Sequence, residues 1–248
     1  MTVTFRYLGI SFFELTTGNG TKILIDPCIT KNTLCPITID DVIDVDLILV
    51  THGAPDHMGD ALEIQKKTGA TLVSDAAVKA HAIRMGVDKD KVISILWGDQ
   101  IEVQGVTVKA VECRHINFLQ SGDLYLSGIP LSFIIYPEDG VRIYNAGDTA
   151  LFSDLKLIGR LYRPNIALIP IGGTPELTGG YSHLPPQEAA LAAQWIGADV
   201  VIPTHYQPDT EEVAVFTKYL SLLTPSIHVL AIKPGDTRTY DPHTLQFT

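Results

Sequence analysis

A short segment of the chain contains two histidines and an aspartate, the composition of a metal-binding loop. Residues 51–57 read Thr-His-Gly-Ala-Pro-Asp-His and follow the apolar run 47–50, which predicts a buried strand. The glycine and the proline favour a loop over a regular helix at this point. Imidazole nitrogens from His52 and His57 and a carboxylate oxygen from Asp56 are ligands that zinc accepts. An ordinary polar loop at the end of a strand can have the same composition. Residues elsewhere in the chain must therefore show whether this loop binds a metal.

Three more residues of the same kind follow predicted strands further along the chain. His115 comes after the apolar run 106–111, Asp148 lies in Asn-Ala-Gly-Asp-Thr, and His205 lies in Ile-Pro-Thr-His-Tyr. A metal site is well built when rigid strands deliver the ligand side chains at their ends. The sequence therefore predicts a centre for a divalent metal.

These motifs resemble the metallo-β-lactamase superfamily, whose signature is His-x-His-x-Asp-His, a later single His, a Gly-Asp and a last His. The resemblance covers nearly the whole chain and looks closest to small metal-dependent hydrolases that include ascorbate-6-phosphate lactonase-like proteins. The further matching segments are 7–9, 23–27, 45–52, 58–60, 145–149, 157–159 and 168–173. The resemblance implies a four-layer αββα sandwich of mixed α/β (α+β) class, formed by a single domain over residues 1–248.

The resemblance also implies a set of metal ligands. They are His52 and His115 at a first site, Asp56, His57 and His205 at a second site, and Asp148 as a bridge between the two. Two cations that share a carboxylate and a water lower the pKa of that water toward neutrality. Ala54 stands where the family has its second histidine, so we expect one or two ions, Zn²⁺ or Mn²⁺, with the first site weakened.

His183 has three interpretations. It precedes a predicted helix in the segment 179–186, and this pattern resembles phosphodiesterase and tRNA-processing branches that use the histidine in catalysis, whereas lactonase-like relatives tend to carry Met there. The side chain protonates a leaving group or binds developing negative charge, fills the coordination gap left by Ala54, or lies on the surface before the helix. We assign His183 to catalysis together with Asp148, which orients the nucleophile, and Asp56.

Other residues near these motifs each have a structural and a functional interpretation. Asp26 either orients a ligand histidine or forms a turn. Cys113 offers a thiolate or, as we prefer, is a small buried residue. Tyr206 lines the pocket or lies at an interface. The glycine pairs 172–173 and 179–180 lack a P-loop lysine and are expected to be loop hinges near the site.

Short apolar runs rich in valine and isoleucine recur along the chain and predict strands. The predicted strands are 3–8, 22–25, 47–50, 71–73, 92–95, 106–111, 132–136, 141–144, 167–169, 200–202 and 229–232. Helices are predicted at 60–68, 76–85, 186–196 and 211–223, and the first three are followed by a glycine. Because strands occur both in hairpin-like groups and between helices, we expect two sheets packed face to face with helices outside.

The composition restricts the partners. The formal net charge is −10, so the surface repels polyanions, and we expect a small-molecule substrate and no nucleic acid. No apolar stretch reaches the roughly 20 residues that cross a bilayer, and no signal peptide is recognisable, so no membrane partner is expected. Three cysteines without a CxxC pair fit a reducing compartment, and the cytoplasm is the expected location. Assembly into a homo-oligomer is left open.

The main functional expectation is a metal-dependent hydrolase in which an activated water attacks a lactone, cyclic amide or other ester-like bond. A phosphodiesterase with His183 as the acid is an alternative. A relative that binds a ligand without turnover is another, because Ala54 has removed a ligand. Ile10 stands where the family has a histidine after Tyr-Leu-Gly, which removes a further polar group from the expected pocket.

Overall fold

Two β-sheets, a small hairpin and five helices are formed by the residues that the computed structural model describes, 1–173 and 183–248. The strands are β1 (Val3–Tyr7), β2 (Phe13–Thr16), β3 (Lys22–Ile25), β4 (Leu47–Leu49), β5 (Thr71–Ser74), β6 (Val92–Ser94), β7 (Gln100–Val103), β8 (Val106–Glu112), β9 (Phe118–Ser121), β10 (Leu124–Ser127), β11 (Leu131–Glu138), β12 (Val141–Asn145), β13 (Ile166–Pro170), β14 (Val200–Thr204), β15 (His228–Val229), β16 (Thr237–Asp241) and β17 (Gln246–Phe247). The helices are α1 (Ala61–Thr68), α2 (Ala76–Arg84), α3 (Leu155–Tyr162), α5 (Pro186–Ile196) and α6 (Glu212–Leu223).

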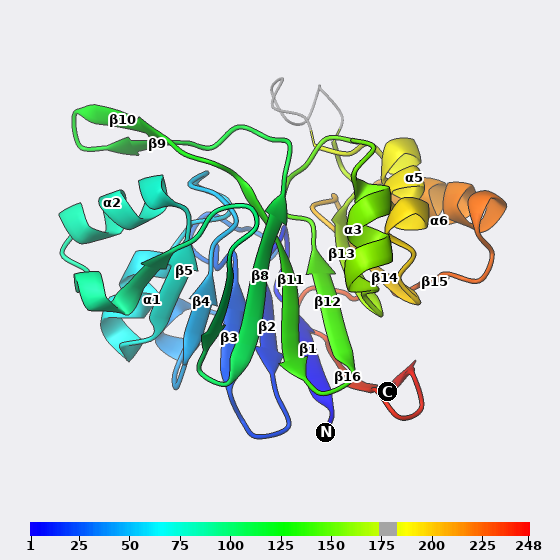
Figure 1. Cartoon of the computed structure of the whole chain (residues 1–248), viewed down its shortest axis with the longest axis horizontal. Helices are drawn as coiled ribbons and strands as arrows, with labels where there is room; N and C mark the ends of the chain where they lie inside the picture. The colour runs from blue at the N-terminus through cyan, green and yellow to red at the C-terminus, as the bar shows by residue number, and fades with distance from the viewer. Residues whose placement is uncertain (174–182) are drawn as a thin grey trace.

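The two larger sheets lie face to face (Figure 1). The first has the strand order β17-β16-β1-β2-β3-β4-β5-β6 and the second β15-β14-β13-β12-β11-β8-β7. Strands β3 to β6 pair in parallel in the first sheet, and β12 to β15 pair in parallel in the second. Because the carboxyl ends of parallel strands meet at one edge of a sheet, the segments after β12 and β14 emerge together. The segment after β4 leaves the facing sheet beside them, since Asp56 contacts His205.

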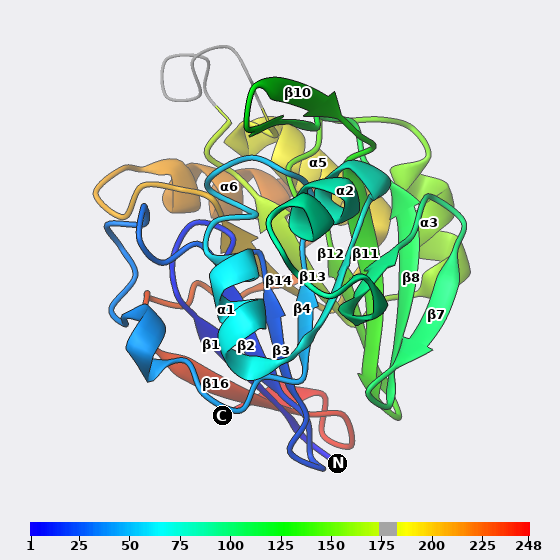
Figure 2. The same ribbon diagram turned by 90° about the vertical axis from the view of Figure 1, so that its left-hand side faces the viewer.

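Three apolar clusters separate four layers. The inner cluster fills the space between the sheets with fully buried side chains from both, such as Phe5 and Leu15 facing Phe133 and Ile143. A second cluster packs α1 and α2 on the outer face of the first sheet, as Figure 2 shows, and a third packs α3, α5 and α6 on the outer face of the second. The predicted αββα sandwich is therefore confirmed.

Helices α1 and α5 each end at a glycine whose backbone adopts the left-handed conformation. Gly69 follows α1 with φ 74° and Gly197 follows α5 with φ 68°, so each caps its helix as expected. Pro186 begins α5, where its missing N–H has no partner to lose. None of the helices in the described part of the chain is long and apolar enough to cross a bilayer.

Several elements were not predicted. The strands β2, β9, β10, β16 and β17 are short and lack continuous valine and isoleucine runs. Helix α3 was missed because Gly159 lies inside it; a Cβ at this position would come within 2.4 Å of the carbonyl oxygen of Ile196, so the glycine lets α3 approach the end of α5 closely. The last predicted strand, 229–232, was wrong after Val229, where β15 ends.

Candidate metal centre

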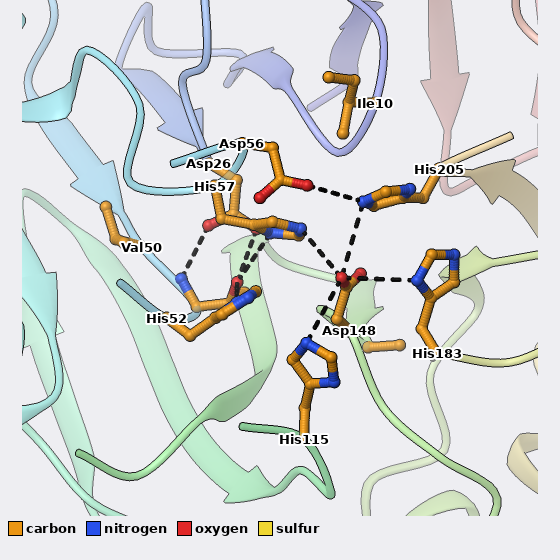
Figure 3. A network of polar contacts seen from close by, with 12 residues as sticks. Ile10, Asp26, Val50, His52, Asp56, His57, His115, Asp148, His183 and His205 are labelled. Carbon is orange, nitrogen blue, oxygen red and sulfur yellow. Dashed lines mark hydrogen bonds and ion pairs between the residues drawn. The ribbon is translucent and has the colours of Figure 1, made fainter. Parts of the chain in front are cut away.

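The predicted ligands meet around one carboxylate at the edge of the sheets where the strands end (Figure 3). Oδ2 of Asp148, which follows β12, lies 3.3 Å from Nε2 of His57 and 3.6 Å from Nε2 of His205. The same oxygen lies 3.8 Å from Nε2 of His115 and 3.6 Å from Nδ1 of His183. These separations exceed those of ordinary hydrogen bonds. They match the roughly 3.4 Å between two ligands of one tetrahedral ion whose bonds are near 2.0–2.1 Å.

The loop after β4 contributes the other two predicted ligands. The ring of His52 lies 4.2 Å from that of His57 and 5.1 Å from that of His115, measured between centroids. Oδ2 of Asp56 lies 3.2 Å from Nε2 of His205, within hydrogen-bond distance. The structure therefore brings together all six residues that the sequence nominated as ligands.

Asp26 holds one of these histidines in position. Its Oδ2 accepts a hydrogen bond from Nδ1 of His57 at 2.8 Å, and its two oxygens also accept the backbone N–H and the hydroxyl of Thr51 at 2.7 and 2.8 Å. The carboxylate of Asp26 is fully buried, and the backbone of Asp26 has a φ of 48°, a conformation that is uncommon outside glycine. Such a contact fixes the tautomer and ring orientation of a ligand histidine, here with Nε2 toward Asp148. Of the two interpretations of Asp26, the structure supports the orienting role.

His183 lies inside the cluster, so its interpretation as a surface residue is wrong. Its side chain is 1% exposed, and its ring centroid is 4.2 Å from that of His205. The sequence left this open because His183 lies in a short stretch before α5, and no apolar periodicity there indicates whether a side chain is buried.

The glycine pair 172–173 makes room for the two histidine backbones. A Cβ on Gly173 would lie 1.9 Å from the carbonyl oxygen of His183, and one on Gly172 would lie 2.2 Å from that of His205. The two glycines therefore serve close backbone approach, which corrects their interpretation as hinges. The second predicted pair, 179–180, lies outside the described residues.

Buried polar atoms without partners mark the place where an ion fits. Nε2 of His52, Nε2 of His57 and Oδ1 of Asp148 have no hydrogen-bond partner among the described residues, although buried polar atoms are nearly always paired. Three trios of ligand atoms lie within 4.8 Å of one another: His52, His57 and Asp148; Asp56, His57 and His205; and Asp148, His183 and His205. The donor set thus fits a divalent cation, and His115 belongs to none of these trios.

The carboxylates of the centre are held in their charged form. Burial raises the pKa of Asp148, but the neighbouring imidazoles of His205 and His57 outweigh it and bring that pKa well below its usual range. Burial also raises the pKa of Asp56, and the hydrogen bond from His205 together with the charge of His57 more than reverses the effect. Ionised carboxylates are the form that binds a metal.

The imidazoles divide into two groups. Burial lowers the pKa of His183 to about 4 and that of His52 well below its usual value, because a charged ring is poorly solvated there. Burial has the same effect on His57, but the carboxylates of Asp148 and Asp26 outweigh it and raise the pKa of His57 well above its usual value. This shift favours the protonated form of His57 in the protein without metal, and a cation would compete with that proton.

A cavity of about 400 Å³ opens over the cluster. Its wall combines the ligand side chains with the apolar residues Ala54, Pro55, Ile116 and Phe118 and with the carboxylate of Glu212. Sequence reasoning missed three of these. Ile116 and Phe118 follow the predicted ligand His115 by one and three residues, so their closeness in sequence could have indicated that they line the cavity. Glu212 lies near the start of a predicted helix, and nothing in the sequence indicated its position in the cavity wall.

Cys113 and Tyr206 have structural roles. The thiol of Cys113 is buried and lies 2.9 Å from the carbonyl oxygen of Asp148, so it behaves as the small buried residue that we preferred. Burial raises the pKa of this thiol, which keeps it protonated. The ring of Tyr206 stacks on Tyr7 with centroids 6.4 Å apart and is not among the residues that line the cavity.

Comparison with known proteins decides the family. Residues 21–206 match the model of the beta-lactamase superfamily domain. A UPF0173 metal-dependent hydrolase from Methanobrevibacter smithii is 37% identical over 97% of this chain and 98% of its own length. The chain belongs to the UPF0173 metal-dependent hydrolase family of the metallo-β-lactamase superfamily. The predicted superfamily is confirmed, and the lactonase-like branch stays a prediction.

Two further comparisons agree with this membership. The UPF0173 metal-dependent hydrolase of Rubrobacter xylanophilus is 36% identical over 93% of each chain. A solved structure, that of Igni18, described as a novel metallo hydrolase from the hyperthermophilic archaeon Ignicoccus hospitalis, superimposes on this UPF0173 protein with a TM-score of 0.81 and 32% identity. The match covers 97% of this chain and 99% of that one, so the fold is shared over nearly the whole chain.

Proposed function

We propose that this metal-dependent hydrolase cleaves a small uncharged lactone, cyclic amide or other ester-like substrate. The observation that carries the proposal is the cavity over the cluster, in which ligand atoms share one wall with apolar side chains. Such a site binds an apolar body while it presents the reacting bond to polar groups. The volume of about 400 Å³ suits a small molecule.

A divalent ion, Zn²⁺ or Mn²⁺, held by these residues would supply a nucleophilic water at neutral pH and polarise the substrate oxygen that gains charge. Asp148 is ionised and its Oδ1 has no hydrogen-bond partner among the described residues, so this oxygen can orient the nucleophile. Asp56 has a side chain 43% exposed at the cavity wall and is ionised, so it can accept a hydrogen bond from the nucleophilic water and help to orient it.

The charges of the cavity favour an uncharged substrate over a phosphodiester. Asp56, Asp148 and Glu212 line it, and no lysine or arginine does so among the described residues. The sequence of residues 174–182 contains one glutamate and no lysine or arginine. One divalent ion offsets two of these three negative charges, so a phosphodiester would still meet net repulsion, whereas a lactone or ester carries no charge to repel.

A substrate panel tests the proposal. The metal-stripped protein is supplied with Zn²⁺ or Mn²⁺ and assayed on lactones, a chromogenic ester and a chromogenic phosphodiester. We expect turnover of a lactone, cyclic amide or ester that needs metal and is lost in Asp148→Ala. Hydrolysis of the phosphodiester alone would overturn the substrate class, and tight metal binding without any turnover would support the ligand-binding alternative.

We also propose that the protein acts in the cytoplasm on a small molecule without a nucleic-acid partner. The three cysteines, Cys28, Cys35 and Cys113, are all free, which fits a reducing compartment. The net charge of −10 opposes association with nucleic acid. Fractionation of the producing cells checks the location, and enrichment in an extracellular fraction would contradict it.

A further inference from the structure

His183 belongs to the cluster but not to the superfamily signature of metal ligands, whose members follow the ends of strands. His183 comes from the stretch before α5 in the C-terminal half, whereas the loop after β4 carries Ala54 at the place of a ligand histidine. The chain has therefore lost an imidazole from one element and placed another in the same centre from a different one.

We propose that His183 is a metal ligand, and that a single ion lies on the His205 side of Asp148. The proposed donors are Asp56, His57, Asp148, His183 and His205. The proposal concerns metal binding and extends the proposed function by saying which side chains hold the ion.

The position of the ring carries the assignment. Nδ1 of His183 lies 3.6 Å from Oδ2 of Asp148, the same distance that separates this oxygen from Nε2 of His205 (Figure 3). The ligand atoms of these three residues lie within 4.8 Å of one another, close enough to share an ion. At 3.6 Å, Nδ1 is too far from the carboxylate for a hydrogen bond, so no direct contact with Asp148 explains its orientation.

The backbone is built to keep the ring there. The N–H of Gly173 donates to the carbonyl oxygen of Leu184 at 3.1 Å, next to His183. Neither Gly172 nor Gly173 leaves space for a Cβ between the strand-end segment and the two histidines. A functional site needs side chains that are held in position by packing before the ligand binds, and these contacts hold His183 in that way.

His183 does not fill the gap left by Ala54. Among the described residues, no trio of ligand atoms joins His183 to His52 or His115. The side of Asp148 that has lost its loop histidine therefore stays poor in donors, and the opposite side gains one.

The enlarged donor set has a consequence for the choice of metal. Three imidazoles and two carboxylates exceed the three protein ligands that a catalytic zinc usually has. Ions that accept five or six ligands of mixed nitrogen and oxygen type, such as Mn²⁺ or Fe²⁺, suit this set better than a tetrahedral ion does.

Metal titration of full-length variants tests the assignment. The probes are Zn²⁺, followed by calorimetry and metal analysis, and Co²⁺, followed by its visible absorption bands, which report on the ligands directly. We expect the wild type to bind one ion and His183→Gln to bind it about 100-fold more weakly with altered Co²⁺ bands, because loss of groups that only orient ligands already costs roughly 10–100-fold.

A matched control separates ligand loss from loss of packing. His81→Gln also replaces a buried imidazole, on α2 and away from the cluster, and should leave the dissociation constant and the Co²⁺ bands unchanged. Circular dichroism melting of both variants without metal checks that they fold.

The outcomes distinguish this proposal from the proposed function. If the wild type binds one ion and His183→Gln keeps its affinity and Co²⁺ bands, the ligand assignment is wrong whether or not turnover falls. If the folded wild type binds neither ion, both the assignment and the metal-dependent hydrolase mechanism are overturned.

Discussion

The two sides of Asp148 differ in the number of ligand atoms that they offer. On one side lie His52 and His115, and His115 belongs to no compact trio of ligand atoms. On the other side Asp56 and His205 lie 3.2 Å apart, and two trios overlap at His205. A bridging carboxylate therefore need not serve two equal sites. The poorer side is the one to which the family resemblance assigns the histidine that Ala54 replaces.

The largest expected effect follows from removing the residue that both sides share. Asp148→Asn keeps the shape of the side chain but replaces the ionised oxygen that faces four imidazoles. We expect the bound ion to be lost and kcat/KM to fall by roughly 10³-fold, which corresponds to about 4 kcal/mol of transition-state stabilisation. Asp154→Asn, on the surface before α3, is the matched control. Full metal content in Asp148→Asn would contradict a shared carboxylate.

The second effect contrasts the two sides directly. His205→Ala removes a member of two trios, whereas His52→Ala removes a member of one. We expect His205→Ala to weaken the binding of one Zn²⁺ by about 100-fold or more and His52→Ala to weaken it by less than about 10-fold. Calorimetric titration measures both constants. Equal losses would mean that the ion lies between the two sides.

A third change attempts to restore the poorer side. Ala54→His returns an imidazole to the loop that already carries His52 and Asp56. We expect the bound metal to rise from one ion toward two, with the added ion the weaker, because a first site needs three protein ligands to hold zinc firmly. Metal analysis after dialysis gives the stoichiometry. If Ala54→His still binds one ion per chain, the loop does not place residue 54 where it can bind a second ion.

The smallest effect concerns pH and the protein without metal. The pKa of His183 is about 4 in the folded chain, below the value of about 6.5 expected when the chain is unfolded. Between these values His183 binds a proton only in the unfolded chain, so its contribution to stability falls as the pH falls from about 6.5 to 4. His183→Gln should flatten this dependence in urea titrations at several pH values. An unchanged slope would show that other groups, such as His52, set it.

The sequence predicted the layers well and nominated residues that lie together in the structure, because both follow from local patterns. Valine and isoleucine runs marked the sheet cores, and Asp and His at their ends marked the centre; all six nominated ligands meet around Asp148. His183 was assigned to the site, but its burial and the backbone contacts of the glycine pair 172–173 could not be predicted, because both depend on contacts between segments far apart in the chain. No local pattern records that kind of contact.

The position of the ion is the most direct test of the difference between the two sides. Crystals of the wild type grown with Mn²⁺ or Zn²⁺, with anomalous diffraction collected at the metal edge, would locate it. The account predicts one strong peak bonded to His205, Asp148 and Nδ1 of His183. A single peak bonded to His52 and His115, with His183 uncoordinated, would contradict it.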